Sequence, residues 1–256
     1  MEILSAILPL HLLALAALVT LIAGTVKGAV GFAMPMIMIS GLAAFMPVEL
    51  ALAALIVPTL ISNGIQALRQ GPEAAVQSIK RFRVFLMVGF IFLVASAQLV
   101  VRLPQEVLFL AIGLPIVIFV GIQIIGWSPH VAEAHRAKTE VWVGAIAGSI
   151  GGLSGVWGPP TVAYLTAIET PKGEQIRVQG VVYGLGAVAL FGAHLNSGVL
   201  RLATMPLSLA MVPPALVGLW LGFQVHDRMD QRLFRKATLI VLFVAGLNLV
   251  RRALFN

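Results

Sequence analysis

Two clusters rich in glycine and proline hold most of the residues that could do chemistry in this sequence. The first reads Gly24-Thr-Val-Lys-Gly-Ala-Val-Gly-Phe-Ala-Met-Pro35, and the second reads Gly148-Ser-Ile-Gly-Gly-Leu-Ser-Gly-Val-Trp-Gly-Pro-Pro160. Each cluster interrupts an apolar stretch and ends on proline, which suits the first turn of a helix. A helix start presents backbone N–H groups and a partial positive charge. We therefore expect two helix starts that together bind an anion.

The expected substrate-binding residues are hydrogen-bond donors and positions that let an anion approach the backbone. The first cluster supplies Thr25, Lys27, Gly28, Gly31 and Pro35, and the second supplies Ser149, Gly152, Ser154, Gly155, Trp157, Gly158 and Pro159. Later segments add Asn63 and Tyr183. Three alternatives stay open. One is that the glycines serve only close helix packing, and another is that Trp157 and Tyr164 only pack. Asn63 and Gln66 share one helix face, as do Gln179 and Tyr183, and for these four residues we favour hydrogen bonds to other helices over contact with the substrate.

Lys27 is the one charged residue between Glu2 and Glu49. A charged side chain at membrane depth costs roughly 3 kcal/mol, so it needs a partner or water. We expect its ammonium group to meet the anion. The alternative is a side chain that extends to the membrane interface and anchors the helix there.

The composition indicates a polytopic helical membrane protein. Of the 256 residues 59% are hydrophobic and 11% are charged, against about 25% charged in soluble domains. These values argue against a soluble enzyme, a nucleic-acid binder and a disordered chain. The absence of cysteine excludes disulfides and thiolate chemistry. We expect no metal and no cofactor, since His130 and His135 lack a third ligand nearby in the sequence.

The two clusters belong to an internal repeat with an offset of 124 residues. The matched pairs are Gly24 with Gly148, Thr25 with Ser149, Gly28 with Gly152, Gly31 with Gly155, Pro35 with Pro159, and Pro47 with Pro171. An ordered set of matches without a gap predicts two homologous halves.

Positive charge predicts that the halves have opposite orientations in the membrane. If each half is a broken hairpin followed by three spanning helices, twelve Lys and Arg fall on one side and four on the other, Lys27 set aside. Basic loops stay in the cytoplasm. The connections 69–83, 128–138 and 226–236 are therefore expected inside and both termini outside, in an inner cell membrane. Whether the hairpins are re-entrant or span fully stays open.

The predicted fold is all-α, with two inverted-topology repeats whose breaks meet near the membrane midplane. The first repeat is expected over 1–127, with a hairpin at about 5–46 and helices at about 49–69, 83–101 and 106–127. A cytoplasmic connection covers 128–138. The second repeat covers 139–256, with a hairpin at about 140–169 and helices at about 176–200, 205–226 and 235–254.

The clusters resemble the duplicated signature of the TauE/SafE sulfite exporter family, also called the 4-toluene sulfonate uptake permease family. The first half has Gly31-Phe-Ala-Met-Pro35 where many members have a Gly-Gly-Gly run. The resemblance implies a secondary transporter of a small anion, such as sulfite, a sulfonate or another organosulfur or organic acid, moved by alternating access. Expected partners are this anion, membrane lipid, a coupling proton or sodium ion, and a second copy in a homodimer. Exact substrate, direction, coupling and oligomeric state stay open, and the competing classes are an intramembrane enzyme and a membrane assembly factor.

Overall fold

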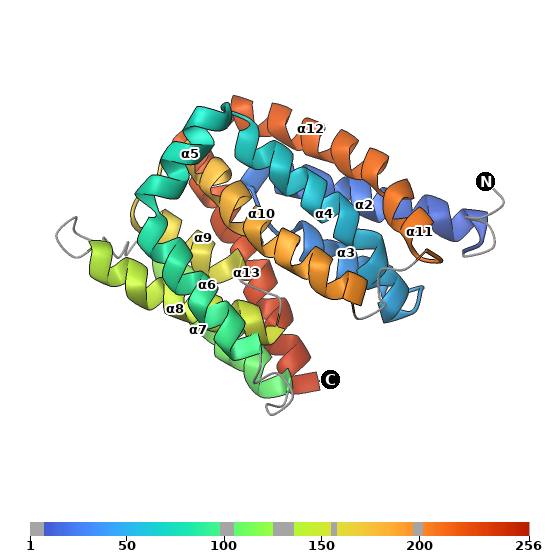
Figure 1. Cartoon of the computed structure of the whole chain (residues 1–256), viewed down its shortest axis with the longest axis horizontal. Coiled ribbons are helices and arrows are strands. Elements are labelled where there is room, and N and C mark those ends of the chain that lie inside the picture. The colour runs from blue at the N-terminus through green and yellow to red at the C-terminus, as the bar shows by residue number, and fades with distance from the viewer. Residues whose placement is uncertain (1–7, 98–104, 125–135, 155–157, 197–201, 256) are drawn as a thin grey trace. The chain divides into compact units, whose positions relative to one another are not determined.

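A computed structural model describes residues 8–97, 105–124, 136–154, 158–196 and 202–255 of the chain. The described residues form helices and turns and contain no strand. Figure 1 shows the helices in chain order, from α2 near the N-terminus to α13 at the C-terminus. The helices group into two compact units.

The first unit combines residues 1–72 with residues 179–230. Its helices are α2 (Leu10–Val30), α3 (Met34–Leu42), α4 (Val48–Leu68), most of α10 (Lys172–Asn196), α11 (Met205–Ala210) and α12 (Val212–Arg228). The expected single helix over 205–226 is two helices here, because Pro213 and Pro214 sit in the first turn of α12 just after the end of α11. An apolar core of α2, α3, α4 and α11 side chains holds the unit together, with Met34, Met38 and Leu42 fully buried.

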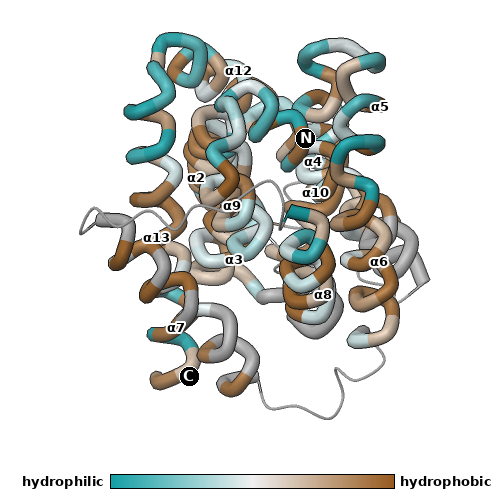
Figure 2. Tube along the Cα trace, turned by 90° about the vertical axis from the view of Figure 1, so that its left-hand side faces the viewer, coloured by the Kyte–Doolittle hydropathy of each residue, from teal (hydrophilic) through white to brown (hydrophobic). Residues whose placement is uncertain are grey.

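The second unit combines residues 73–178 with residues 231–256. Its helices are α5 (Pro72–Arg81), α6 (Arg83–Ala97), α7 (Gln105–Ile124), α8 (Arg136–Ser154), α9 (Gly158–Ala167), the start of α10 and α13 (Gln231–Phe255). The short helix α5 lies in the connection that the sequence leaves without structure. Figure 2 shows α5 largely hydrophilic and the following helix α6 largely hydrophobic.

Helix starts recur along the chain with nearly constant spacing. Adding 124 to the first residues of α2, α3, α4 and α7 gives 134, 158, 172 and 229, and helices α8, α9, α10 and α13 start at 136, 158, 172 and 231. The interruptions between α2 and α3, and between α8 and α9, follow the same spacing. The helices therefore keep the register of the sequence repeat.

Each unit contains a close helix pair that joins the two halves of the sequence. In the first unit α2 packs along α12, and in the second α8 packs along α6 (Figure 1). The contact relies on glycine, because a Cβ atom at Gly28 would overlap the carbonyl oxygen of Leu219, and one at Gly148 would overlap that of Gly89. Small residues let helix backbones approach this closely in membranes.

Four described helical stretches are long and apolar enough to cross a membrane: Leu10–Val30, Leu50–Leu68, Met205–Arg228 and Gln231–Phe255. Apolar side chains on these stretches also face outward, for example Leu18, Trp220 and Val244, which are 53%, 59% and 61% exposed. Outward apolar faces on helices of this length suit contact with lipid.

Candidate functional site

The candidate site lies in the first unit, where the chain breaks between α2 and α3. Helix α2 ends at Val30, and Gly31 follows with a φ of 90°, which glycine adopts without steric cost. The N–H of Gly31 donates to the carbonyl of Lys27 at 2.7 Å and closes the helix. Ala33 then has a φ of 74°, an unfavourable value for alanine. Such strain is found at functional sites more often than elsewhere.

Helix α3 starts directly after the strained residue, at Met34, with Pro35 in its first turn. Proline in the first turn is what the sequence predicts for this start. The N–H of Ile37 donates to the carbonyl of Ala33 at 3.0 Å. The N–H groups before it belong to the first turn, which has no partners within a helix. The break therefore presents a helix N-terminus, the element that the sequence predicts for anion binding.

Lys27 lies one turn before the break and is buried, with 1% of its surface exposed. Its ammonium group donates a hydrogen bond to the side-chain oxygen of Asn63 on α4. No carboxylate of the described residues forms an ion pair with it. The side chain is thus held inside the unit by a neutral amide, rather than extended to an interface.

Two glutamines hold the backbone of the break. The amide nitrogen of Gln66 on α4 donates to the carbonyl of Gly31 at 2.9 Å. Gln179 on α10 faces the same place, and with its amide nitrogen toward the break it donates to the carbonyls of Gly31 at 2.9 Å and Val30 at 3.2 Å. Both side chains are fully buried. These are the interhelical hydrogen bonds favoured from the sequence, and they fix the carbonyls that helix α2 leaves unpaired at its end.

The other expected residues of the first cluster lie in different surroundings. The hydroxyl of Thr25 donates to the carbonyl of Leu21 at 2.9 Å, and its backbone lies against Gly218 and Gly222. Gly28 also lies against α12. Tyr183 is buried on α10, one turn beyond Gln179. The structure thus brings Lys27, Gly31 and Asn63 together, whereas Thr25 and Gly28 serve the packing of α2.

The second cluster is described only in part. Ser149 is half-buried in α8, and Gly158 and Pro159 start α9, with Pro159 buried. Gly155 and Trp157 lie outside the described residues, as do the surroundings of Gly152 and the side chain of Ser154. Roles of these residues in binding stay predictions.

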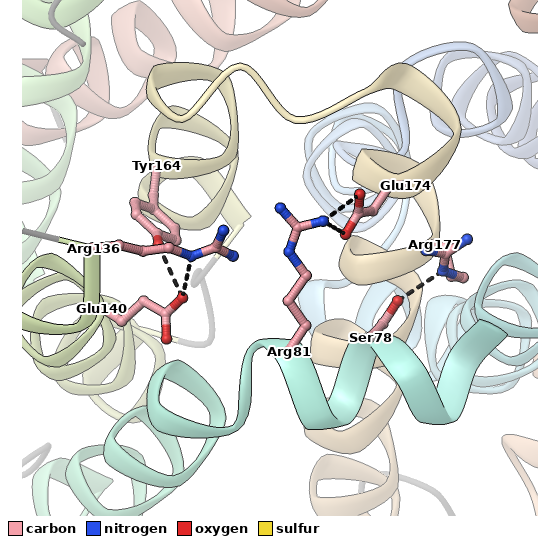
Figure 3. Close-up of polar contacts among 7 residues, drawn as sticks. All are labelled: Ser78, Arg81, Arg136, Glu140, Tyr164, Glu174 and Arg177. Atoms are coloured by element: carbon pink, nitrogen blue, oxygen red, sulfur yellow. Dashed lines mark hydrogen bonds and ion pairs between the residues drawn. The ribbon is translucent and has the colours of Figure 1, made fainter. Parts of the chain in front are cut away.

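The second hairpin carries a buried polar group that sequence reasoning missed. The carboxylate of Glu140 on α8 accepts a hydrogen bond from Arg136 at 3.1 Å and one from the Tyr164 hydroxyl of α9 at 3.2 Å (Figure 3). The Tyr164 ring stacks on Phe85 of α6, with centroids 5.9 Å apart. The four-residue spacing of Arg136 and Glu140 signals an ion pair on one helix face. It could have been found from the sequence, whereas its tyrosine partner could not.

Two further contacts tie α5 to the first turns of α10. Arg81 pairs with both carboxylate oxygens of Glu174 at 2.7 and 2.9 Å, and Arg177 donates to the Ser78 hydroxyl at 2.7 Å (Figure 3). Among the described residues no group of three or more His, Cys, Asp or Glu could hold a metal ion.

Apolar helices of spanning length define the class: a helical membrane protein. The sequence model of the family described as "Sulfite exporter TauE/SafE" matches residues 16–249, nearly the whole chain. The chain belongs to this family, whose members are membrane transporters of sulfite and related anions and not enzymes. No curated protein and no solved structure matches it.

Proposed function

We propose that the protein is a secondary transporter that moves sulfite, a sulfonate or a related small acid by alternating access, and that Lys27 binds the anion at the first break. The buried ammonium group of Lys27 carries this proposal. Removing a charge from water is costly, and an amide oxygen compensates only part of the cost. An anion beside the ammonium group would supply the missing charge, and the start of α3 adds a partial positive charge.

Asn63 then has two roles: it bonds to Lys27 when no anion is bound, and it is a ligand of the bound anion. Its side-chain oxygen accepts from Lys27 in the absence of an anion. An anion that enters can take over this hydrogen bond, and the NH2 group of Asn63 can donate to the anion. Gln66 and Gln179 bond to the backbone instead, so we assign them to holding the break in shape.

The flux of labelled sulfite into proteoliposomes tests this function. Lys27→Met keeps the side-chain length and removes the charge, and it should lower flux roughly 10- to 100-fold, as expected for one lost charged hydrogen bond. Lys27→Arg should restore part of the flux, because a planar guanidinium fits a different geometry. Lys138→Met, at an exposed position on α8, is the matched control. Normal flux in Lys27→Met would refute the role of Lys27, and no sulfite flux in the wild-type chain, with sulfonates and small carboxylates also inactive, would refute transport.

We also propose that the two repeats are inverted in the membrane. Packing directions support this: along α2, Gly24 faces Ala215 and Gly28 faces Gly222, so α2 and α12 run parallel. The chain reverses its direction at each membrane crossing. Helices α2 and α12 are therefore parallel only if an odd number of spanning helices lies between the first hairpin and the second. An odd number puts the second hairpin on the opposite face.

Single cysteines in this cysteine-free chain test the topology. Glu73→Cys and Arg228→Cys are both exposed positions in basic connections. In intact cells both should resist an impermeant thiol reagent, and both should react in inverted vesicles. Labelling of one but not the other in intact cells would contradict the inverted arrangement.

A further inference from the structure

The second unit contains a pocket, with polar and charged side chains in its wall, that the transport proposal does not use. It has a volume of about 370 Å³ and lies where the end of α9, the start of α10 and the start of α13 come together. The lining residues are Thr166, Glu169, Thr170, Pro171, Gln175, Gln231, Arg232, Phe234 and Arg235. This volume falls in the range of small-molecule sites.

Three buried side chains in the pocket wall have polar atoms without a hydrogen-bond partner. They are the hydroxyl oxygens of Thr166 and Thr170 and the amide nitrogen of Gln175. The three residues are 5%, 3% and 2% exposed. Unpaired buried polar atoms are costly and rare. Since rotation about χ1 exchanges the hydroxyl and the methyl group of threonine, both threonines can turn a donor toward a bound molecule.

The charges and helix ends at the pocket favour an anion. Arg232 and Arg235 both line it, and Arg232 forms no ion pair with the described residues. Arg235 lies 3.7 Å from the carboxylate of Glu169, which leaves the pocket with a net positive charge. Helices α10 and α13 both begin here, and a Gln231 amide bonded to the N–H of Lys172 at 2.8 Å and to the carbonyl of Thr170 at 3.2 Å joins them. Helix starts and guanidinium groups are the usual ligands of oxyanions.

The first repeat shows that the fold does not require these polar groups. Subtracting 124 from the lining positions gives Leu42, Phe45, Met46, Pro47, Ala51, Val107, Leu108, Leu110 and Ala111, which are all apolar. Leu42, Met46 and Ala51 are packed in the core of the first unit. If this end of the second repeat faces the cytoplasm, as proposed above, that location explains its exposed arginines. It does not explain the two buried threonines and the buried glutamine whose polar atoms have no partner.

We propose that this pocket is a second anion site, which binds a small oxyanion such as sulfate or a phosphate group independently of Lys27. The guanidinium of Arg232 contacts the anion first, and the hydroxyl of Thr170 and the amide of Gln175 donate to its oxygens. The anion competes with Glu169 for Arg235. Free oxyanion and the phosphate of a lipid headgroup share this chemistry.

Sulfate binding to the purified full-length chain tests the site. Every chain compared also carries the background substitution Lys27→Met, which should weaken binding at the first site roughly 10- to 100-fold. Thermal unfolding is followed against sulfate concentration at constant ionic strength. Arg232→Gln and Thr170→Val should each raise the half-saturating sulfate concentration at least about tenfold. Thr170→Val should not lower the unfolding temperature without sulfate, because it removes an unpaired buried hydroxyl. Lys236→Gln, one residue beyond the pocket on the same helix, should bind like the background.

The outcomes separate this site from the transport site. Equal sulfate dependence in the Arg232→Gln, Thr170→Val and Lys236→Gln chains would overturn the pocket, as would loss of all sulfate binding in the Lys27→Met background. Neither result bears on flux through Lys27, which the proteoliposome assay decides. A repeat with phosphatidylglycerol in the detergent distinguishes the sources: a lipid-occupied pocket loses its sulfate response, and a pocket for free oxyanion keeps it.

Discussion

The two hairpins have the same helix register but place their charges differently. In the first hairpin a cation, Lys27, lies beside the break and has a neutral partner. The position of Lys27 corresponds to Gly151 in the second hairpin, and Glu140 corresponds to Ala16 in the first. The buried charge of the second hairpin, Glu140, is paired with Arg136 near the start of α8. A charge that is already paired stabilises a hairpin, whereas one without a counter-charge is available to a ligand.

The largest expected loss of stability comes from disturbing the close glycine contacts that both hairpins make with a neighbouring helix. Gly28→Ala and Gly148→Ala each force a Cβ atom into a backbone carbonyl of the neighbouring helix. Each should destabilise its unit by about 3 kcal/mol or more and reduce the yield of folded protein. Gly64→Ala, at a helical glycine with open space around it, should be neutral or slightly stabilising. Equal unfolding temperatures of the three variants would show that close packing is not what these glycines provide.

A smaller effect should come from breaking the ion pair of the second hairpin. Arg136→Gln leaves the buried carboxylate of Glu140 with the Tyr164 hydroxyl as its remaining partner, and should cost about 3 kcal/mol. Tyr164→Phe removes one hydrogen bond and should cost about 1 kcal/mol. Thermal unfolding in detergent measures both. Sulfite affinity should be unchanged in Tyr164→Phe, and a tenfold loss there would assign anion binding to the second hairpin as well.

The first hairpin should respond differently when its polar pair is removed. Asn63→Leu leaves the Lys27 ammonium group without its neutral partner and should destabilise the chain by about 1–3 kcal/mol. The double variant Lys27→Met with Asn63→Leu replaces both partners by apolar groups and should recover most of this loss. Its flux should stay as low as that of Lys27→Met alone. Recovery of flux together with stability would show that the pair is structural only.

The smallest effects are expected at exposed ion pairs, of which we take one from each unit. Arg69 bonds to both oxygens of Asp227 at 2.7 Å, and Arg81 pairs with Glu174. Arg69→Gln and Arg81→Gln should each cost at most about 1 kcal/mol, and less at high salt, because exposed pairs are screened. Unfolding temperatures measured in low and high salt check this. A loss as large as that of Arg136→Gln would mean that exposed and buried pairs contribute alike.

Sequence reasoning located the helical stretches and the break, because both have local causes. Glycine density and Pro35 predict the interruption, and α3 starts one residue before that proline. Lys27 stands out since a lone charge in an apolar stretch is visible without a structure. The short helices α5 and α11 were not predicted, since connections and proline-interrupted segments carry weak periodicity.

Partners across the fold could not be predicted in the same way. Helices in a membrane are apolar on all sides, so hydrophobic periodicity does not tell which face packs against which helix. The contacts of Gly28 with α12 and of Glu140 with Tyr164 depend on shape and on distant segments. The surroundings of Gly28 agree with the alternative that this glycine serves close helix packing. Lys27 is buried against Asn63, so its side chain does not extend to the membrane interface as the other alternative requires.

Equilibrium binding of labelled sulfite to the purified chain tests most directly whether Lys27 is the charge that contacts the anion. Wild type, Lys27→Met and Lys138→Met are compared in detergent at constant ionic strength, with thermal unfolding as the check on folding. Lys27→Met should unfold cooperatively and bind sulfite roughly 10- to 100-fold more weakly, and Lys138→Met should bind like wild type. Equal dissociation constants for a folded Lys27→Met chain and for wild type would rule out this role of Lys27.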